Sequence, residues 1–341
     1  MPFEVPQMMK AVVVFETGDA DQLSVQKDFP VPQLIEGHAL VKNDYAGVNF
    51  IDTYHRGGLY PRQVPFVCGQ EGDGTIAALP LGSDFHIGDR VIYGSLGSYS
   101  EYSLVPLSKL VPLPDDIDME VAITCMVQGL TAHYLVTSAH ADLIQKGEWM
   151  LIFSVGSGTC QWAAQMAKLK GYKVIGTCSK GKLDKARETH CDELIVLDEV
   201  KDQKYADYSS VDIVENVMSL TQGQGVKCIL DGVGRSTSEI SLKCLARRGI
   251  FVSFGNASGS VEAFPVLKLT PKSAFVTRPK LGDYVATRDE LMTRMNEVFE
   301  WVRQGNLRVG IDNEFALEQA AEAHRYIEAG KTGGKLLLKI A

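Results

Sequence analysis

The sequence predicts an α/β protein made of a β-rich, barrel-like unit and a unit with a doubly wound parallel sheet. Residues 9–130 alternate short apolar runs with Gly, Pro and Asp, which is typical of an antiparallel β unit. From Gly147 onward, apolar strands alternate regularly with helix-like segments, and this alternation indicates a parallel sheet with right-handed crossovers. A chain of 341 residues is long enough for two domains.

The elements are expected in the following order. The strands of the first unit lie in MKAVVVFE, HALVKNDYAG, GTIAALP, GDRVIYG and YSEYSLVP, and residues 116–138 are helical. In the second unit we expect strands at 150–154, 173–178, 194–197, 226–232, 250–255 and 273–278, with helices at 159–170, 182–189, 210–222 and 236–247. Helices at 288–304 and 316–328 then precede the strand KLLLKI. The predicted division is 1–131 with 279–341 for the first domain and 132–278 for the second.

Composition excludes several classes of protein. Apolar residues make up 45% of the chain and charged residues 22%, and the net charge is −8. A negative charge of this size argues against non-specific binding to nucleic acid or to anionic membranes. The sequence has no apolar run of ~18 residues and no apolar stretch at its N-terminus, so we expect neither a membrane span nor a signal peptide. Seven cysteines scattered without a C-x-x-C pair indicate reduced thiols and a cytoplasmic protein.

The segment FSVGSGTCQWAAQ (153–165) has the layout of a phosphate-binding loop between a strand and a helix. Gly156, Ser157, Gly158 and Thr159 would bring small side chains and a flexible backbone to a helix N-terminus, where a pyrophosphate can bind. However, Gln161 stands where the G-x-G-x-x-G pattern has its third glycine. A tight structural turn with a serine helix cap is therefore the alternative.

The end of the next strand favours a particular nucleotide. NAD sites place an Asp or Glu about 20 residues after the loop, where it binds the ribose 2′-hydroxyl. Here the corresponding text is GTCSKGK (176–182), which contains no acid. The small hydroxyl residues Thr177 and Ser179 and the two lysines Lys180 and Lys182 would instead suit a 2′-phosphate, which indicates NADPH rather than NADH. The alternative for either lysine of this segment is a solvated helix start.

Several long motifs resemble the zeta-crystallin-type quinone oxidoreductases, a zinc-free branch of the medium-chain dehydrogenase/reductase superfamily. They are GVNFIDTYHRGGLYP (47–61), GQEGDGTI (69–76), GDRVIYG (88–94), QGLTAHYL (128–135), RRGIFVSFGNASG (247–259) and VTRPKLGDYVATRDEL (276–291). The resemblance covers nearly the whole chain. It implies a GroES-like catalytic domain, a Rossmann domain and NADPH as cofactor.

The resemblance also implies roles for individual residues. Asn49, Asp52, Tyr54 and Tyr60 match the active-site segment of the family. Thr131, Phe254, Gly255 and Asn256 match the positions beside the nicotinamide, and Lys182 matches the lysine that holds the 2′-phosphate. The family loop reads AAAGGVG, whereas this chain has SVGSGTC with Cys160 in place of the last glycine. Leu197 and Gly330 replace a tyrosine and an arginine that the family often has near the cofactor.

Metal chemistry is not expected. The superfamily's zinc enzymes carry a Cys and a His where this chain has Asn49 and Gln70, and amides are poor zinc ligands compared with thiolate and imidazole. Glu71 alone could not hold a catalytic zinc. Without a Lewis acid the substrate must accept reducing equivalents unaided, and a quinone does so because its π-system delocalises negative charge.

The sequence therefore predicts an NADPH-dependent, zinc-independent quinone oxidoreductase. The resemblance favours ortho-quinones and one-electron transfer to the semiquinone, while two-electron transfer stays open. Tyr54 and Tyr60 are the candidate hydrogen-bond donors to a quinone oxygen. The alternatives are an enone or alkenal double-bond reductase and a non-catalytic NADPH- or RNA-binding protein. The family includes RNA-binding members, but Arg247 and Arg248 are an isolated basic pair, so nucleic acid is not expected as the main partner. The family also implies a homodimer that pairs through the edge strand 273–278.

Overall fold

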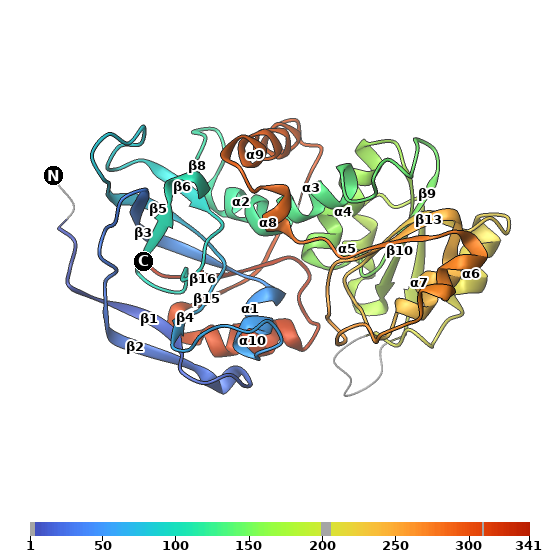
Figure 1. Cartoon of the computed structure of the whole chain (residues 1–341), viewed down its shortest axis with the longest axis horizontal. Coiled ribbons are helices and arrows are strands. Elements are labelled where there is room, and N and C mark those ends of the chain that lie inside the picture. Colours follow the sequence, from blue (N-terminus) through green and yellow to red (C-terminus); the bar gives the residue numbers. More distant parts are fainter. Residues whose placement is uncertain (1–3, 199–205, 309) are drawn as a thin grey trace. The chain divides into compact units, whose positions relative to one another are not determined.

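The computed structural model describes residues 4–198, 206–308 and 310–341. The chain packs as two compact units (Figure 1). The first contains Met1–Val127, Thr287–Phe299 and Gly310–Ala341, and the second contains Gln128–Ala286 and Glu300–Val309. Among the described residues, no helix combines the length and the apolar content that a membrane span requires.

The first unit is a β-rich domain with two sheets. Its strands are β1 (Met8–Val14), β2 (Leu23–Pro30), β3 (His38–Val48), β4 (Phe66–Val67), β5 (Glu71–Ala78), β6 (Arg90–Tyr93), β7 (Tyr102–Pro106), β8 (Leu110–Pro112), β15 (Ile311–Ala316) and β16 (Lys335–Lys339). Its helices are α1 (Phe50–Arg56), α2 (Met119–Thr124) and α10 (Ala320–Glu328), with short 3-10 helices η1 (Ala20–Gln22), η2 (Leu107–Lys109) and η6 (Leu317–Gln319). One sheet has the order β2-β1-β4, and the other has the order β15-β16-β3-β5-β6-β8 with β7 paired to β3.

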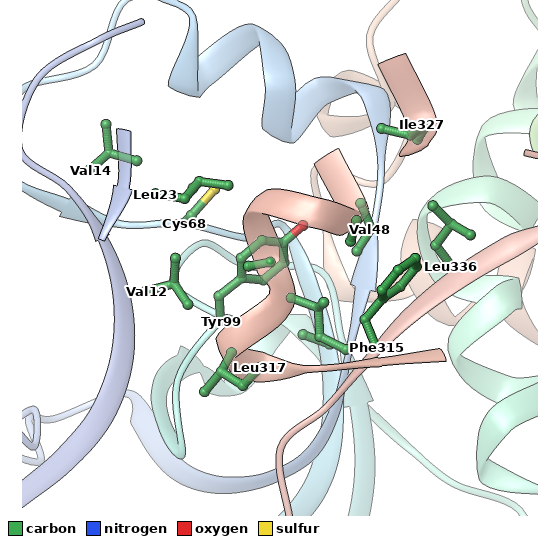
Figure 2. Close-up of a cluster of buried hydrophobic side chains, with 14 residues drawn as sticks. Val12, Val14, Leu23, Val48, Cys68, Tyr99, Phe315, Leu317, Ile327 and Leu336 are labelled. Carbon is green, nitrogen blue, oxygen red and sulfur yellow. The ribbon is translucent and has the colours of Figure 1, made fainter. Parts of the chain in front are cut away.

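The C-terminal strand completes the larger sheet of the first unit. β16 pairs antiparallel with β3, with Leu337 opposite Gly47, and parallel with β15. The apolar residues of β16 enter a core that also takes side chains from β1, β3 and α10. Figure 2 shows the ring of Tyr99 inside this cluster, with Leu336 beside Phe315. The ring is fully buried, so its hydroxyl group must find partners within the protein.

The second unit is a parallel α/β domain. Its strands are β9 (Trp149–Ile152), β10 (Lys173–Ser179), β11 (Glu193–Leu197), β12 (Val226–Asp231), β13 (Leu245–Ser253) and β14 (Phe275–Thr277). Its helices are α3 (Leu130–Thr137), α4 (Gly158–Leu169), α5 (Leu183–Arg187), α6 (Ile213–Leu220), α7 (Ser238–Cys244) and α8 (Leu281–Tyr284), with η4 (Lys180–Lys182) and η5 (Val266–Lys272). The π-helix η3 (Cys125–Gly129) and the helix α9 (Arg288–Arg303) each include residues of both units.

The sheet of the second unit has the strand order β11-β10-β9-β12-β13-β14, and all of its pairs are parallel. Numbered from its first strand, this order is 3-2-1-4-5-6, which is the Rossmann arrangement. The central strands WMLI and VKCILD are almost entirely buried, as expected where helices cover both faces of a sheet. The predicted fold class is confirmed.

The predicted helix over 236–247 continues too far at its C-terminal end. The sequence favoured a helix over 236–247, but α7 ends at Cys244 and β13 begins at Leu245. Leu245 pairs with Val226 of β12 and is buried in the core of the unit. Sheet pairing therefore overrides the local helical tendency of LARR at this position.

Candidate functional site

The phosphate loop, which we define as residues 153–158, follows the strand at which the order of the parallel sheet reverses. β9 pairs with β10 on one side and with β12 on the other. In doubly wound sheets, ligands bind at the carboxyl ends of the strands beside this reversal. The loop predicted from the sequence therefore lies where a Rossmann domain holds a nucleotide.

Hydrogen bonds from neighbouring segments fix the start of the phosphate loop. Ser154 has a left-handed backbone with φ of +61°, which is uncommon for a residue with a Cβ. Its N–H donates to Thr177 Oγ1 at 3.0 Å, and its hydroxyl group lies 2.8 Å from the hydroxyl of Tyr208. The ring of Tyr208 packs edge-on against Phe153. The unusual backbone of Ser154 is thus held from both sides.

Both glycines of the loop are needed for space. A Cβ added to Gly156 would lie 2.7 Å from Cβ of Lys182, and one added to Gly158 would lie 2.5 Å from the Gln128 side chain. Gly158 is the first residue of α4, a helix of 12 residues. The Ser157 hydroxyl donates to the Ser154 carbonyl at 2.8 Å and makes no cap to the first turn. The N–H groups at this helix N-terminus therefore have no side-chain cap, and this arrangement fits a pyrophosphate.

Gln161, which occupies the position of the missing third glycine, supports the loop. Its side chain is buried in α4, and its Nε2 donates to the Gly156 carbonyl at 3.2 Å. Cys160 beside it is also buried, and burial raises the pKa of its thiol to about 12. Gln161 thus adds packing and a hydrogen bond within the loop, although it breaks the glycine pattern. Gly156 and Gly158 still allow other groups to come close to the loop backbone.

The predicted 2′-phosphate residues lie beside the phosphate loop. Ser179 ends β10 and Lys182 ends η4, and the stem of Lys182 packs against Gly156. Lys180 differs from Lys182, because it forms an ion pair with Asp198 on the surface. The structure therefore brings Lys182 and Gly156 of the loop together.

The residues predicted to lie beside the nicotinamide also belong to the second unit. Thr131 is on α3, half-buried, and Asn256 is buried in the turn after β13. The ring of Phe254 packs on Gly232, and Gly255 approaches the Gly232 backbone so closely that a Cβ would lie 2.3 Å from its carbonyl oxygen. The turn after β13 is therefore packed against the end of β12. The cofactor roles of these four residues stay a prediction.

In the first unit, the four predicted catalytic residues lie on or just beside α1. Asn49 precedes the helix, and its N–H donates to Asp52 Oδ2 at 2.8 Å, a capping contact that fixes the start of the helix. Asn49 and Asp52 are buried, whereas Tyr54 and Tyr60 are half-buried. The two tyrosine rings meet edge to face with their centroids 5.3 Å apart. The tyrosines are thus the more accessible pair for a substrate.

The side chain of Asn49 is bound to a buried ion pair that the sequence did not predict. Lys335 of β16 and Glu71 of β5 are both fully buried and form a salt bridge. Asn49 Nδ2 donates to Glu71 Oε1 at 2.8 Å, and Lys335 Nζ donates to Asn49 Oδ1 at 3.1 Å. The other oxygen of Glu71 accepts from the Val127 N–H at 2.7 Å. Gly47 leaves the necessary room, since a Cβ there would overlap Glu71 and Lys335.

Asp52 connects this ion pair to a second set of buried polar groups. The Tyr99 hydroxyl donates to Asp52 Oδ2 at 3.1 Å and lies 3.1 Å from His324 Nε2. Arg56 lies 3.1 Å from His324 Nδ1 and forms a bidentate ion pair with Glu328. Arginine only donates, so His324 Nδ1 accepts and its Nε2–H donates to Tyr99.

We call the whole set the buried network. Its members are Arg56, Glu328, His324, Tyr99, Asp52, Asn49, Glu71 and Lys335. Burial and the charge of Arg56 lower the pKa of His324 to about 3, so the imidazole is neutral as the hydrogen bonds require. Burial raises the pKa of Asp52 to about 7, against the effects of the Asn49 N–H and the Lys335 charge. Burial lowers the pKa of Lys335 to about 7, and the Asp52 charge opposes this shift.

The sequence contained one weak sign of this network. Lys335 opens the otherwise apolar run KLLL, and a lysine in a buried strand needs a partner. His324 and Arg56 gave no comparable signal, because each stands beside polar residues in the sequence and not in an apolar run.

At the position where the superfamily's zinc enzymes hold their metal, the side chains of this chain bind one another. Both ends of the Asn49 amide are engaged, and Glu71 binds the Lys335 ammonium group. A metal ion bound to Glu71 would have to displace this ammonium group or lie beside it. Among the residues that the structure describes, no three His, Cys, Asp or Glu side chains are grouped so that they could hold a metal ion.

Comparison with known proteins places the chain in a family. Residues 35–115 match the alcohol dehydrogenase GroES-like domain, and residues 199–338 match the family described as zinc-binding dehydrogenase. The chain is 40% identical over 306 residues to the quinone oxidoreductase of Pseudomonas aeruginosa, and the match covers 87% of this chain and 90% of that protein. The chain belongs to the quinone oxidoreductase family. The predicted family is confirmed, and so is the prediction that the chain is an oxidoreductase.

Two further members of this wider group extend the comparison. The structure of Escherichia coli quinone oxidoreductase complexed with NADPH is 34% identical, covers 97% of this chain and 100% of that chain, and has a TM-score of 0.89. The 2-haloacrylate reductase of a Burkholderia species is 32% identical over 343 residues, covering 97% of this chain and 99% of that protein. The chain is thus similar both to quinone oxidoreductases and to a 2-haloacrylate reductase.

Proposed function

We propose that this chain is an NADPH-dependent, zinc-independent quinone oxidoreductase. The observation that carries the proposal is the packing of Lys182 against Gly156 of the phosphate loop, at the reversal of the Rossmann sheet. A lysine beside a pyrophosphate-binding backbone suits a nucleotide with an additional phosphate. The NADPH complex of the Escherichia coli relative supports the same cofactor.

The residues of the second unit would hold the cofactor in four places. The backbone N–H groups of Gly156–Thr159 would bind the pyrophosphate at the start of α4. None of these four residues has a charged side chain. Lys182 and Ser179 would bind the 2′-phosphate. Thr131 and the segment Phe254–Asn256 would line the nicotinamide end. The bound cofactor supplies the reducing equivalents, and the protein supplies position and orientation.

The first unit would position the substrate. Tyr54 and Tyr60 offer half-buried rings and hydroxyl groups, and a hydroxyl group can donate to a quinone oxygen. The buried network holds α1, which carries Tyr54, through Asn49 and Asp52. The proposal includes zinc independence, because the Lys335 ammonium group already neutralises Glu71. The narrower form of this proposal is that the chain reduces ortho-quinones by one-electron transfer.

The cofactor part is tested by titrating wild type, Lys182→Ala and Lys180→Ala with NADPH and with NADH. Loss of one charge-assisted contact should weaken NADPH binding about 10- to 100-fold in Lys182→Ala. NADH binding should stay unchanged, because NADH lacks the 2′-phosphate. Lys180→Ala is the control, since its charge is paired with Asp198. Equal binding of NADPH and NADH by the wild type would reject the assignment of NADPH.

A double-bond reductase is the second candidate, and the 2-haloacrylate reductase relative supports it. Such a reaction adds a proton to carbon, and Asp52 is a carboxyl group with a raised pKa on α1. However, Asp52 is only 1% exposed, which favours a structural role. NADPH oxidation should be followed with phenanthrenequinone, an alkenal and 2-chloroacrylate. Turnover of the quinone alone would reject this candidate.

We also propose that the chain forms a homodimer through β14. β14 is an edge strand of the Rossmann sheet, and its Phe275 and Val276 are 44% and 38% exposed. An exposed apolar edge strand is a template for pairing. Sedimentation should show a dimer for wild type and for the exposed-surface control Leu81→Glu, and a monomer for Phe275→Glu. A monomeric wild type would contradict the proposal.

A further inference from the structure

Arg62 is a guanidinium group without a matching negative charge. It follows the aromatic segment of α1 and is half-buried. Its one hydrogen-bond contact joins NH2 to His55 Nε2 at 3.4 Å, which is long. Its Nε is buried and has no partner among the residues that the structure describes, and no described carboxylate lies within ion-pair distance of it.

The neighbouring titratable groups do not supply the missing charge. Burial lowers the pKa of His55, and the charge of Arg62 lowers it further, so this imidazole is neutral. Burial raises the pKa of the Cys68 thiol, which is neutral too. Burial lowers the pKa of Arg62, and the charge of the Asp52 carboxyl group opposes this shift. However, Oδ2 of Asp52 accepts from Asn49 and Tyr99, and its Oδ1 has no partner among the described residues. Arg62 and Asp52 therefore each keep an unused buried polar atom.

Arg56, on the same segment, is an arginine whose hydrogen-bond donors have partners. It lies six positions earlier, is 4% exposed and makes a bidentate ion pair with Glu328 at 2.6 and 3.2 Å. A guanidinium group binds planar oxyanions with the same fork geometry. The guanidinium group of Arg62 forms no ion pair with a described carboxylate, whereas that of Arg56 is paired with Glu328.

Aromatic rings lie next to the unused guanidinium group. His55, which contacts Arg62, packs edge-on against Tyr60 with ring centroids 6.0 Å apart. Tyr60 in turn meets Tyr54, and Tyr54 meets Phe50 at 6.3 Å. The segment thus combines aromatic faces, which suit a planar ring, with one positive charge, which suits an oxyanion.

We propose that Arg62 binds an anionic substituent of the electron acceptor, so that this chain prefers planar quinones carrying a sulfonate or carboxylate group. This inference rests on the proposed quinone oxidoreductase activity. It goes beyond that activity because it names the charge of the substrate and the residue that selects it.

The test uses one ring system with and without a negative charge. Wild type, Arg62→Met, Arg62→Lys and Arg303→Met, a control from the second unit, are assayed with NADPH on phenanthrenequinone and on its sulfonated analogue. Loss of a charge-assisted hydrogen bond should lower kcat/KM of Arg62→Met for the sulfonated quinone about 10- to 100-fold, mainly through KM. The neutral quinone should lose less than about threefold, because a charge–charge contact is absent there. Arg62→Lys should recover part of the loss, since it keeps the charge but not the fork.

Three outcomes would overturn the inference. Equal losses on both quinones in Arg62→Met would show that Arg62 only supports the local structure. An unchanged kcat/KM for the sulfonated quinone would show that Arg62 does not contact the charge. If Arg62→Met fails to fold, equal behaviour of Arg62→Lys and wild type on the two quinones would decide against it. A wild type that reduces neither quinone would instead reject the proposed activity itself, and the inference with it.

Discussion

The phosphate loop and the buried network use polar groups in opposite ways. The loop offers backbone N–H groups and small side chains, and its function depends on the space that Gly156 and Gly158 leave. The network takes charged side chains out of water and pairs them with one another, as in Glu71 and Lys335. A ligand can bind to the first region because the N–H groups at the start of α4 have no side-chain cap. The second region holds α1 in place because nearly all of its donors and acceptors are used.

The difference explains why the two regions respond differently to a missing partner. A helix N-terminus without a ligand is still solvated by water. A buried carboxylate without its cation is not, and removing one member of such a pair is more costly than never having had the pair. The comparison therefore predicts large losses of stability in the network and losses of binding in the loop.

Lys335→Met should have the largest effect of the changes considered. It leaves Glu71 fully buried without its cation, and we expect the free energy of unfolding of the first unit to fall by about 3–5 kcal/mol. Urea denaturation followed by circular dichroism would measure this loss, because Trp149, Trp162 and Trp301 all lie in the second unit and their fluorescence reports on that unit. Lys10→Met is the matched control, because Lys10 pairs with Glu318 on the surface of the same unit and should cost at most about 1 kcal/mol.

Two results would show whether the loss of stability in Lys335→Met comes from the unpaired charge of Glu71. The double variant Glu71→Gln/Lys335→Met removes both charges and should recover part of the loss, since neither partner stays behind as a buried ion. If Lys335→Met costs no more than Lys10→Met, the buried pair has no special role in stability, and the contrast between the two regions fails.

Asp52→Asn should change how stability depends on pH. Burial raises the pKa of Asp52 from its ordinary value of 3.8 to about 7 in the folded chain, so the folded state binds the proton more tightly than the unfolded state. The contribution of Asp52 is fully present below pH 4 and is lost as the pH rises toward 7. Asn keeps an acceptor for Asn49 and Tyr99 but does not titrate. Relative to wild type, the stability of Asp52→Asn should therefore increase between pH 4 and 7, by at most about 1.4 kcal/mol per pH unit.

The variant must be compared with wild type because the titration of His324 changes stability with pH in the opposite direction to that of Asp52. The lowered pKa of His324 adds stability above its ordinary value of 6.5 and removes it as the pH falls toward 3. This contribution is common to both proteins and cancels in their difference. Asp198→Asn, an exposed change, should leave the pH profile parallel to that of wild type. A difference that stays constant from pH 4 to 7 would show that Asp52 keeps an ordinary pKa.

The same contrast separates what the sequence could predict from what it could not. The phosphate loop and the alternation of strands and helices depend on residues close together in the chain, so spacing indicated them, while the family resemblance singled out Lys182. The network joins Asn49, Glu71 and Lys335, which meet only when β16 pairs with β3. No local pattern encodes that meeting. The family resemblance singled out Asn49 and Asp52, but only the fold shows that their side chains are bound within the protein.

Gly156→Ala should have the smallest effect of the three changes, and it tests what the loop does. The new Cβ would lie 2.7 Å from Cβ of Lys182 and 3.3 Å from its carbonyl oxygen, so the backbone of the loop or of η4 must shift. We expect NADPH binding to weaken about tenfold, or about 1.4 kcal/mol, with stability of the first unit unchanged. Fluorescence titration would measure the binding. Gly282→Ala in α8 is the control, because a Cβ there meets nothing within 4 Å.

The response to NADH distinguishes the loop from its lysine. The pyrophosphate is common to both nucleotides, so Gly156→Ala should weaken the binding of NADPH and of NADH by the same factor. Lys182→Ala should weaken the binding of NADPH alone. Gly158→Ala should cost less than Gly156→Ala, because its new Cβ meets the end of the flexible Gln128 side chain. If Gly156→Ala affected NADPH only, the clash with Lys182 would be acting through the 2′-phosphate contact. The backbone of the loop would then have no measurable part in binding the pyrophosphate.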